Sequence, residues 1–320
     1  AGIHHLSFGP FAAATGYNLL HQHLYSKGVF HNGQTVNGGT VNLANALKAA
    51  AEFHHVEVQT NSKVISIDTD NGICSGVTLY DGKSVKAKTV VSGLDPQNTF
   101  INLVGAPNLN PNFHTQLRNI KYRGSAARIH FALESLPEIN GVSTDQMGTV
   151  FSICPTIEYL ERASDAVKYG QLAENPYVEF NIPTVPNPDF APAGKHVLSA
   201  TVQYAPYHLR GQKWDNELKS LLKKNVVRVL EKTIPGFSSL IESSIVVSPL
   251  DLENEFGLTE GNLNHGEMTL DQFMFMRPTI SSAQYKSPIE NLYLCGPGTH
   301  PGGGLHGTNG SNAAKEILKK

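Results

Sequence analysis

A glycine-rich segment close to the end of the sequence holds the residues whose types and spacing point most directly to chemistry. Seven glycines lie within residues 296–310, immediately after the apolar run at 291–295. Glycine permits positive φ angles and lets the backbone approach a flat or anionic ligand closely. A helix is expected from about residue 311, and the free N–H groups at its start carry partial positive charge. Such a start suits a phosphate, or the N1–C2=O edge of a flavin that becomes anionic on reduction. The pattern therefore favours a ligand-binding loop over a ligand-free surface loop.

These glycines do not follow the spacing of a dinucleotide-binding turn. The run G-P-G-T-H-P-G differs from G-x-G-x-x-G, and no acidic residue follows about 20 positions later. A dinucleotide pyrophosphate is therefore not the first ligand expected at this loop. A nicotinamide-dependent dehydrogenase would need an intact turn of that kind, so it ranks third among the functions considered.

Three polar residues near this segment are candidates for catalysis, and each has a structural alternative. His265, in the run NLNHGE, either touches substrate or flavin or has a structural hydrogen-bonding role. Arg277 either pairs with a carboxylate or is a structural arginine, and the structural role is slightly favoured. His306, inside the glycine-rich loop, either stabilises the loop or moves a proton, with stabilisation as the default. Because a cofactor performs the difficult chemistry of hydride transfer, no catalytic triad is expected.

Composition and charge exclude several other classes of protein. The net charge is −2 and no long basic run is present, so nucleic-acid binding is not expected. The three cysteines lie far apart, which favours a reducing compartment and gives neither a disulfide framework nor a metal site. The histidine pairs at 4–5 and 54–55 have no partner at metal-ligand spacing, so no metal is expected.

Nothing in the sequence indicates a membrane span or a secretion signal. No uninterrupted apolar stretch approaches the ~20 residues of a membrane-spanning helix. The first residues, AGIHHLSFGP, lack a charged region followed by a long apolar run, so they are not a signal peptide. An intracellular, cytoplasmic location is expected, with the mitochondrial matrix as the alternative in a eukaryote.

The periodicity of apolar residues and the turn signals predict an alternation of helices and short strands. Residues 1–35 are expected to be irregular, and Thr40 is expected to be the N-cap of the helix that follows. Turns at Asp70-Asn71-Gly72 and Asp81-Gly82 predict a β-meander behind that helix. The expected helices are 41–53, 96–103, 111–119, 157–168, 212–233 and 311–319. The expected strands are 56–60, 63–68, 73–80, 83–91, 125–133, 148–154, 177–182, 196–204, 243–249 and 291–295.

Several segments together resemble one known family. They are NLYLCGPGTHPGGGLHGTNGSNAAKEIL, GNLNHGEMTLDQFMFMRP, GYNLLHQHL, NGGTVNLANALKAAAEFHHVEVQTNSKVISI, EFNIPTVPNPDFAP and KHVLSATVQYAPY. The first resembles the C-terminal flavin-contacting motif of the phytoene dehydrogenase and amine-oxidase superfamily. The others resemble a narrower branch, the phytoene-dehydrogenase-like proteins related to pyridine nucleotide-disulphide oxidoreductase domain-containing protein 2. The resemblance covers essentially all of the chain, and it identifies the chain as the C-terminal portion of such an FAD-dependent oxidoreductase.

The resemblance implies an α/β fold made of two interleaved domains. A partial FAD/NAD(P)-binding, Rossmann-like domain would comprise residues 36–95 and 286–320. An α+β substrate-binding domain on a mixed β-sheet would comprise residues 1–35 and 96–285. Members of the family open with a strand, a G-x-G-x-x-G turn and a helix that hold the flavin pyrophosphate. This N-terminal βαβ unit is absent from the sequence, so FAD binding by this chain is an open expectation.

The resemblance also implies which residues surround the FAD. The backbone of Val64 would meet the adenine, and Gly296 and Gly298 would approach the ribityl–pyrophosphate region. Residues 301–307 would line the isoalloxazine ring, and the last helix would point its start at the pyrimidine edge. The full set implied to bind the cofactor is Val64, Gly296, Gly298, Thr299, Pro301, Gly302, Gly303, Gly304, Leu305, His306, Gly307 and Asn312.

The function expected from the resemblance is that of a dehydrogenase or desaturase-like flavoprotein. Its substrate would be an apolar or amphipathic small molecule. The alternative is a non-catalytic binding or protein-interaction module derived from the same fold, for which the low charged fraction of 16% would mark a partner surface. Self-association, or contact with the N-terminal part, is the expected way of covering apolar surface.

Overall fold

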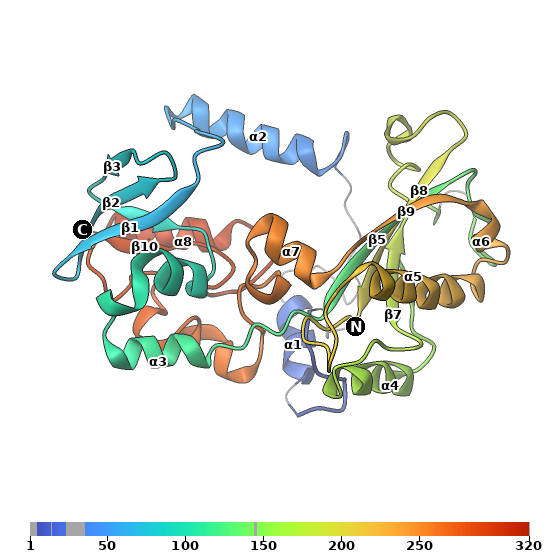
Figure 1. Cartoon of the computed structure of the whole chain (residues 1–320). Helices are drawn as coiled ribbons and strands as arrows, with labels where there is room; N and C mark the ends of the chain where they lie inside the picture. The colour runs from blue at the N-terminus through green and yellow to red at the C-terminus, as the bar shows by residue number, and fades with distance from the viewer. Residues whose placement is uncertain (1–4, 14, 24–35, 144–145, 320) are drawn as a thin grey trace. The chain divides into compact units, whose positions relative to one another are not determined.

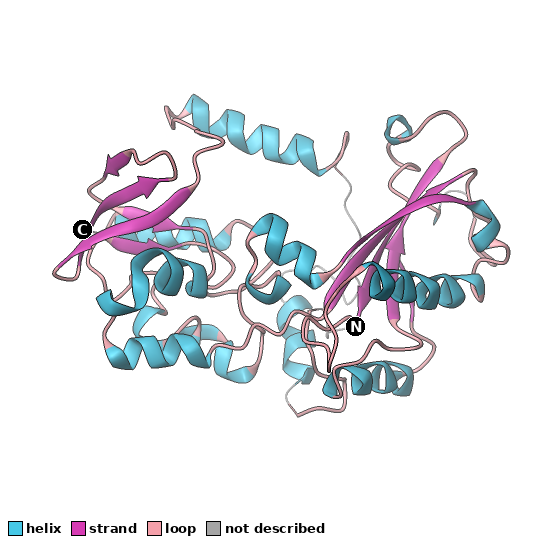
Figure 2. Ribbon diagram, viewed as in Figure 1, coloured by secondary structure: helices cyan, strands magenta, loops and turns pink. Residues whose placement is uncertain are grey.

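A computed structural model describes residues 5–13, 15–23, 36–143 and 146–319 (Figure 1). The chain divides into two compact units. In the described part, the first unit comprises residues 8–60 and 125–248, and the second comprises 5–7, 61–124 and 249–319. Both units combine helices with strands, which confirms the α/β class (Figure 2). Among the described residues, no helix has the length and apolar character needed to cross a membrane.

The first unit is built around a five-stranded sheet. Its strands are β5 (Ala126–Leu133), β6 (Phe151–Ile153), β7 (Tyr177–Asn181), β8 (His196–Gln203) and β9 (Ile241–Val247). They lie in the order β6-β7-β8-β5-β9, and every pairing is antiparallel. The helices of this unit are α1 (Thr15–His23), α2 (Thr40–Phe53), α4 (Ile157–Lys168), α5 (Asn216–Glu231) and α6 (Phe237–Leu240).

One face of this sheet forms the core of the first unit. Side chains alternate between the two faces of a strand, and Ile129, Phe131 and Leu133 of β5 are fully buried on one of them. Phe131 packs edge-to-face on Phe237 of α6, with ring centroids 5.3 Å apart. The sheet is therefore held from one side by apolar burial.

Capping side chains explain where helices α4 and α5 of this unit begin. The Thr156 hydroxyl accepts a hydrogen bond from the Tyr159 backbone N–H at 3.2 Å, and α4 spans the expected residues 157–168. The prediction of a helix over 212–233 was too long, because Asp215 caps the Leu218 N–H at 2.9 Å and α5 begins after it.

The second unit combines a small sheet, a parallel strand pair and a cap of helices. Its strands are β1 (Val64–Asp70), β2 (Ile73–Leu79), β3 (Ser84–Lys86), β4 (Val90–Ser92) and β10 (Leu292–Leu294). The order β1-β2-β3, with antiparallel pairing, confirms the meander. Strand β10 pairs with β4 in parallel. The helices are η1, a π-helix (Gln97–Gly105), α3 (Pro111–Asn119), α7 (Pro249–Phe256) and α8 (Thr308–Ile317). A core containing Phe100, Phe113 and Leu292 joins η1, α3 and β10, with the two phenylalanine rings 4.9 Å apart.

Four expectations about local structure were wrong. Residues 56–60 form no strand, and Val56 and Val58 are exposed, since the described part of the chain places no strand beside them. Residues 1–35, expected to be irregular, contain α1, and α7 was not expected at all. Thr40 is the first residue of α2 rather than its cap, and Gly39 takes the cap position with a φ of 83°.

The boundaries of the two compact units differ from the boundaries expected for the two domains. Residues 36–60 group with the first unit, and residues 96–124 and 249–285 group with the second. The expected domains were defined by ligand binding rather than by packing. Their boundaries therefore stay a prediction.

Candidate functional site

The glycine-rich segment lies between a buried parallel strand and the last helix. Residues 295–307 connect β10 to α8 within the second unit. Helix α8 begins at Thr308 rather than near Ser311, so its first turn starts directly after the glycines. Gly307 takes the cap position in a left-handed conformation with φ 65°, so the cap residue supplies no side chain, and the first turn holds no acidic residue. The neighbouring His306 ring accepts the first N–H, that of Thr308, and the positive end of the helix dipole remains a favourable place for an anion.

The first half of the loop, residues 296–302, is packed against protein. A Cβ atom on Gly298 would lie 2.9 Å from Cδ of Pro96, and one on Gly296 would overlap the backbone of Gly93. Gly302 has a φ of 107°, and a Cβ there would come within 2.6 Å of the Met268 side chain. Glycine is required at these positions because neighbouring chain segments occupy the space.

Asn309 fixes the shape of this buried half. Its side-chain amide donates to the Gly296 carbonyl at 3.2 Å, to the Thr299 carbonyl at 3.0 Å and to the His300 carbonyl at 3.3 Å. The Thr299 hydroxyl in turn donates to the Gly296 carbonyl at 2.8 Å. Asn309 is buried, so these contacts are shielded from water. One side chain of α8 thus holds the preceding loop.

The second half of the loop is open. Residues 304–307 are exposed, and Leu305 reaches 91% exposure. Gly304 has a φ of 132°, and no atom lies within 4 Å of a Cβ position on Gly307. The His306 ring accepts a hydrogen bond from the Thr308 backbone N–H at 3.1 Å through Nδ1, so it closes the entrance to α8. This half has the space for a ligand that the first half lacks.

His265 lies against the buried half of the loop. It is 9% exposed, and its Nδ1 atom is buried with no hydrogen-bond partner in the described part of the chain. A Cβ on Gly296 would lie 3.2 Å from this Nδ1 atom, and one on Gly298 would lie 3.4 Å from Cβ of His265. Burial lowers the pKa of His265; the charge of Asp95 opposes this shift and that of Arg277 adds to it.

Arg277 donates all its hydrogen bonds to backbone carbonyls. It is 1% exposed, and Nε donates to the Pro297 carbonyl at 3.0 Å. Its terminal nitrogens donate to the carbonyls of Gly266 at 3.1 Å, of Gln272 at 3.4 Å and of Asn264. Burial lowers the pKa of Arg277 to about 10. The guanidinium joins the glycine-rich loop to the loop that carries His265.

A buried carboxylate holds the same region from the other side. Glu267 is fully buried and accepts hydrogen bonds from the Ser7 backbone N–H and the Ser7 hydroxyl, both at 2.6 Å. Its other oxygen pairs with Arg123 at 2.5 Å. Burial raises the pKa of Glu267, and these two partners oppose the rise. The carboxylate links residues 5–7 to a loop 260 positions later in the sequence.

The structure brings part of the predicted site together. His265, Arg277, Gly296, Gly298 and Gly302 lie in one packed region. The remaining predicted residues of the loop differ in burial. Thr299 and Pro301 are buried, and Gly303 is half-buried. The exposed ones are Gly304, Leu305, His306 and Gly307.

Two predicted residues lie apart from the loop itself. Val64 is half-buried at the start of β1, where a register shift interrupts its pairing with β2. The Asn312 amide donates to the Tyr285 hydroxyl at 2.8 Å, and that hydroxyl donates to the His300 carbonyl at 2.8 Å. Asn312 is therefore tied to the loop through Tyr285.

Sequence reasoning missed the residues that hold the site from a distance. Among them are Asn309, Glu267, Ser7 and Tyr285. Asn309 carried a weak signal, because an amide in the first turn of a helix beside a glycine loop can reach free carbonyls. The Ser7–Glu267 contact carried none. No group of three or more His, Cys, Asp or Glu among the described residues is placed to hold a metal ion.

Comparison with known proteins gives this arrangement a family. The family model described as "Flavin containing amine oxidoreductase" matches residues 11–318. Pyridine nucleotide-disulfide oxidoreductase domain-containing protein 2 of Rattus norvegicus is 33% identical over 97% of this chain and 55% of its own length. The lycopene-forming phytoene desaturase of Paracoccus sp. is 27% identical over 95% of this chain and 58% of its own length.

A solved structure supports the fold. An oxidoreductase from Methanosarcina mazei superposes with a TM-score of 0.56 at 16% identity, over 89% of this chain and 55% of that one. The chain spans a little over half the length of the relatives that it matches, with coverages of 55% and 58%. Activity, substrate and partners of the whole protein are therefore matters for proposal.

Proposed function

The chain belongs to the flavin-containing amine oxidoreductase family, and we propose that it is part of an FAD-dependent oxidoreductase whose glycine-rich loop and helix α8 contact the flavin. The observation that carries the proposal is the open half of the loop, residues 304–307, which leads into a helix start without an acidic residue. A flavin gains negative charge at its N1–C2=O edge on reduction, and a helix start stabilises such charge.

The residues present fit such a cofactor. Gly304, Leu305 and Gly307 offer an exposed surface with positive φ angles at both glycines. Gly296 and Gly298 shape the loop beneath this surface, and Pro301 to Gly303 turn the chain toward it. Val64 and Asn312 complete the proposed contacts.

The chain's own residues would orient the cofactor and keep water out. A bound flavin would supply the electron-accepting chemistry. His265 is neutral near pH 7, because burial lowers its pKa, and it packs against the buried half of the loop, so we assign it to positioning that half. Arg277 acts as a positioning residue, since its hydrogen bonds go to the backbone. His306 holds the entrance of α8 in place.

The proposed substrate is an apolar or amphipathic small molecule. The Paracoccus relative is named as a phytoene desaturase, which acts on an apolar substrate. That support comes from a relative at 27% identity. The substrate class of this chain must therefore be inferred from the side chains on its own surface.

Flavin binding by the chain tests the proposal. The purified chain is mixed with FAD, desalted and examined by visible absorption. The proposal predicts a retained, stoichiometric flavin spectrum. A colourless protein after desalting contradicts it. The Gly16→Ala variant in α1 is a control away from the loop, because no atom lies within 4 Å of a Cβ at that position, and it should retain as much flavin as the wild-type chain.

A further inference from the structure

The five-stranded sheet of the first unit has a second face whose centre is uncovered in the described part of the chain. At one end of this face Tyr177 and Gln203 are each 1% exposed, and Tyr177 belongs to a buried cluster that includes Leu160 of α4. Beyond that end the residues are half-buried or exposed, and Ile245 of β9 is 67% exposed. An antiparallel sheet commonly leaves one face to solvent, so the chemistry of the side chains must show whether this face has a ligand.

Register places polar side chains of three strands, and apolar side chains of β9, in two rows across this face. Residues directly opposite each other in antiparallel strands point to the same side of a sheet. Arg128 lies between Thr201 and Val247, and Thr201 lies opposite Glu179. In the next row His130 lies between Ser199 and Ile245. The two rows put a cation, an imidazole and hydroxyl groups beside an apolar edge.

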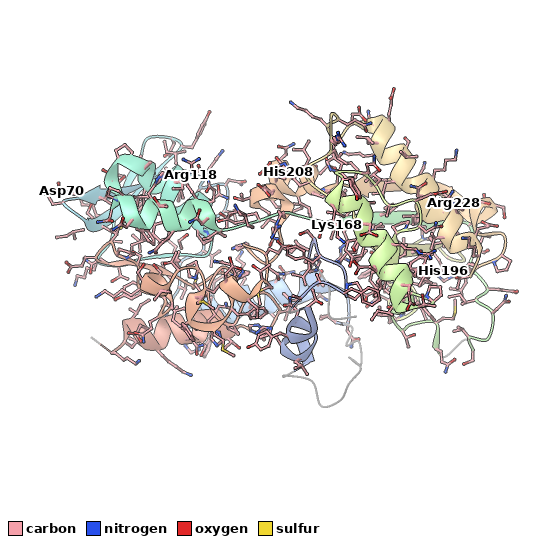
Figure 3. All side chains as sticks on the ribbon, turned by 90° about the horizontal axis from the view of Figure 1, so that it is seen from below. Asp70, Arg118, Lys168, His196, His208 and Arg228 are labelled. Carbon is pink, nitrogen blue, oxygen red and sulfur yellow. The ribbon has the colours of Figure 1, made fainter. Side chains whose placement is uncertain are left out.

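Arg128 has no partner in the described part of the chain. Its guanidinium makes no hydrogen bond and no ion pair there, and Glu179 acts on it only through charge at longer range. Two other basic side chains of the same unit, labelled in Figure 3, do have partners: Arg228 pairs with Glu174 at 2.9 Å, and Lys168 with Glu161 at 3.2 Å. An arginine carries five donors in a fixed fork, and those of Arg128 stay available.

The surroundings make this free cation a favourable place for an anion. Desolvation by the protein lowers the pKa of Arg128, although part of the side chain stays exposed. Desolvation and the charge of Arg128 likewise lower the pKa of His130. A carboxylate placed against the guanidinium would make bidentate, charge-assisted hydrogen bonds. Its negative charge would also oppose the lowering of the pKa values of Arg128 and His130. The hydroxyl of Thr201 stands in the same row as a further donor.

Glu179 argues against a cationic ligand. It is the acidic residue of these strands on the open face, and it accepts a hydrogen bond from the Tyr177 hydroxyl at 3.2 Å. It lies two strands from Arg128, roughly 10 Å away at the usual strand spacing. The acid has a partner and the base has none, so the charge left uncompensated on this face is positive.

The edge of the same face is apolar. Ile245 is exposed and Val247 is half-buried on β9, directly opposite His130 and Arg128. Ala132 and Val197, opposite each other one row further, are half-buried. A molecule lying along this face would meet a charged group at one point and methyl groups around it.

We propose that the open face of the five-stranded sheet binds a small molecule with a carboxylate group and an apolar chain, the carboxylate on Arg128 and the chain along Ile245 and Val247. This inference rests on the proposed function, because it names the substrate class of the same oxidoreductase as an amphipathic carboxylate rather than a pure hydrocarbon.

The test compares three probes of one chain length on the full chain without flavin, by titration calorimetry. The probes are octanoate, octan-1-ol and octylammonium. Octanoate is expected to bind about tenfold more tightly than octan-1-ol, the difference that one charge-assisted contact supplies. Arg128→Met should remove this difference, and Arg128→Lys should keep most of it. Arg162→Met, which removes an exposed arginine on α4, is the matched control and should change nothing.

Several outcomes would overturn the inference. They are equal binding of octanoate and octan-1-ol, preference for octylammonium, absence of octanoate binding, and unchanged octanoate binding by Arg128→Met. Flavin retention separates this failure from that of the proposed function. A chain that retains flavin but does not distinguish the probes rejects the inference alone, and a colourless chain that binds octanoate through Arg128 rejects the flavin proposal alone.

Discussion

Residues 296–302 and residues 304–307 are both rich in glycine, yet they meet different surroundings. Gly303, between them, is half-buried against Asn264. In the first stretch, Cβ atoms would collide with Gly93, Pro96 and Met268. In the second stretch Gly307 faces open space, and Leu305 is 91% exposed. Glycine is needed in the buried half for packing of the protein on itself. In the open half, we propose that contact with a ligand is the reason for the glycines. Substitutions should therefore damage stability in the buried half and ligand binding in the open half.

The largest effect is expected when the buried half loses its arginine. Arg277→Met leaves the carbonyls of Asn264, Gly266 and Pro297 without their donor. The free energy of unfolding should fall by about 3 kcal/mol, because buried acceptors without partners are costly. Urea denaturation followed by circular dichroism measures this. An unchanged unfolding midpoint would show that Arg277 does not hold the two loops together.

A slightly smaller effect is expected from overpacking in the buried half. Gly298→Val would push against Pro96, whose Cδ lies 2.9 Å from a Cβ at residue 298. Unfolding should become easier by about 2 kcal/mol, the usual cost of forcing extra atoms into a packed site. The control is Gly310→Ala in α8, where the space is open and alanine favours the helix. Equal stability of the two variants would contradict the division of the loop.

The two asparagines of α8 provide a finer comparison. Asn309→Ala removes hydrogen bonds to Gly296, Thr299 and His300 and should cost about 2 kcal/mol of stability. Asn312→Ala removes the bond to the Tyr285 hydroxyl and should cost about 1 kcal/mol or less. Thermal unfolding of both variants ranks them. The reverse order would mean that Asn309 does not organise the buried half.

A smaller, pH-dependent effect is expected from His265. Its folded-state pKa is lowered by burial, so the unfolded chain binds the proton more tightly. Its contribution to stability is therefore lost as the pH falls below the unfolded value of about 6.5. Asparagine tolerates the positive φ of 55° at residue 265, so His265→Asn is the suitable variant. Its free energy of unfolding should fall less steeply between pH 7 and 5 than that of the wild type, with a difference in slope below about 1.4 kcal/mol per pH unit. Urea midpoints at the two pH values test this, and parallel losses in variant and wild type would contradict it.

Local features of the fold were predictable from the sequence. The Asp70-Asn71-Gly72 turn marked the hairpin between β1 and β2, and Thr156 marked the start of α4. Alternation alone misled at 56–60, where the described structure offers no neighbouring strand. A strand forms only when a partner supplies its hydrogen bonds, and a sequence pattern does not contain that partner.

The candidate site was predictable in kind but not in arrangement. Glycine density and the following helix marked the loop. The division into a buried and an open half depends on contacts from far along the chain, such as Gly93 against Gly296 and Asn264 against Gly303. The assignment of Arg277 to positioning depends on four backbone carbonyls that no spacing rule identifies. Burial and partner identity are tertiary properties, so they had to come from the structure.

The open half of the loop gives the most direct test of flavin contact. Gly307→Asp and Gly307→Asn have nearly the same shape, and both tolerate the left-handed conformation with φ 65°. Only the aspartate places a negative charge at the start of α8, where it would stabilise the helix and repel an anionic ligand. Titration with FAD, monitored by the quenching of flavin fluorescence, should give an affinity about fivefold weaker for the Asp variant than for the Asn variant. The Asp variant should unfold no more easily than the Asn variant. Equal affinities would contradict the claim that the flavin lies at this helix start.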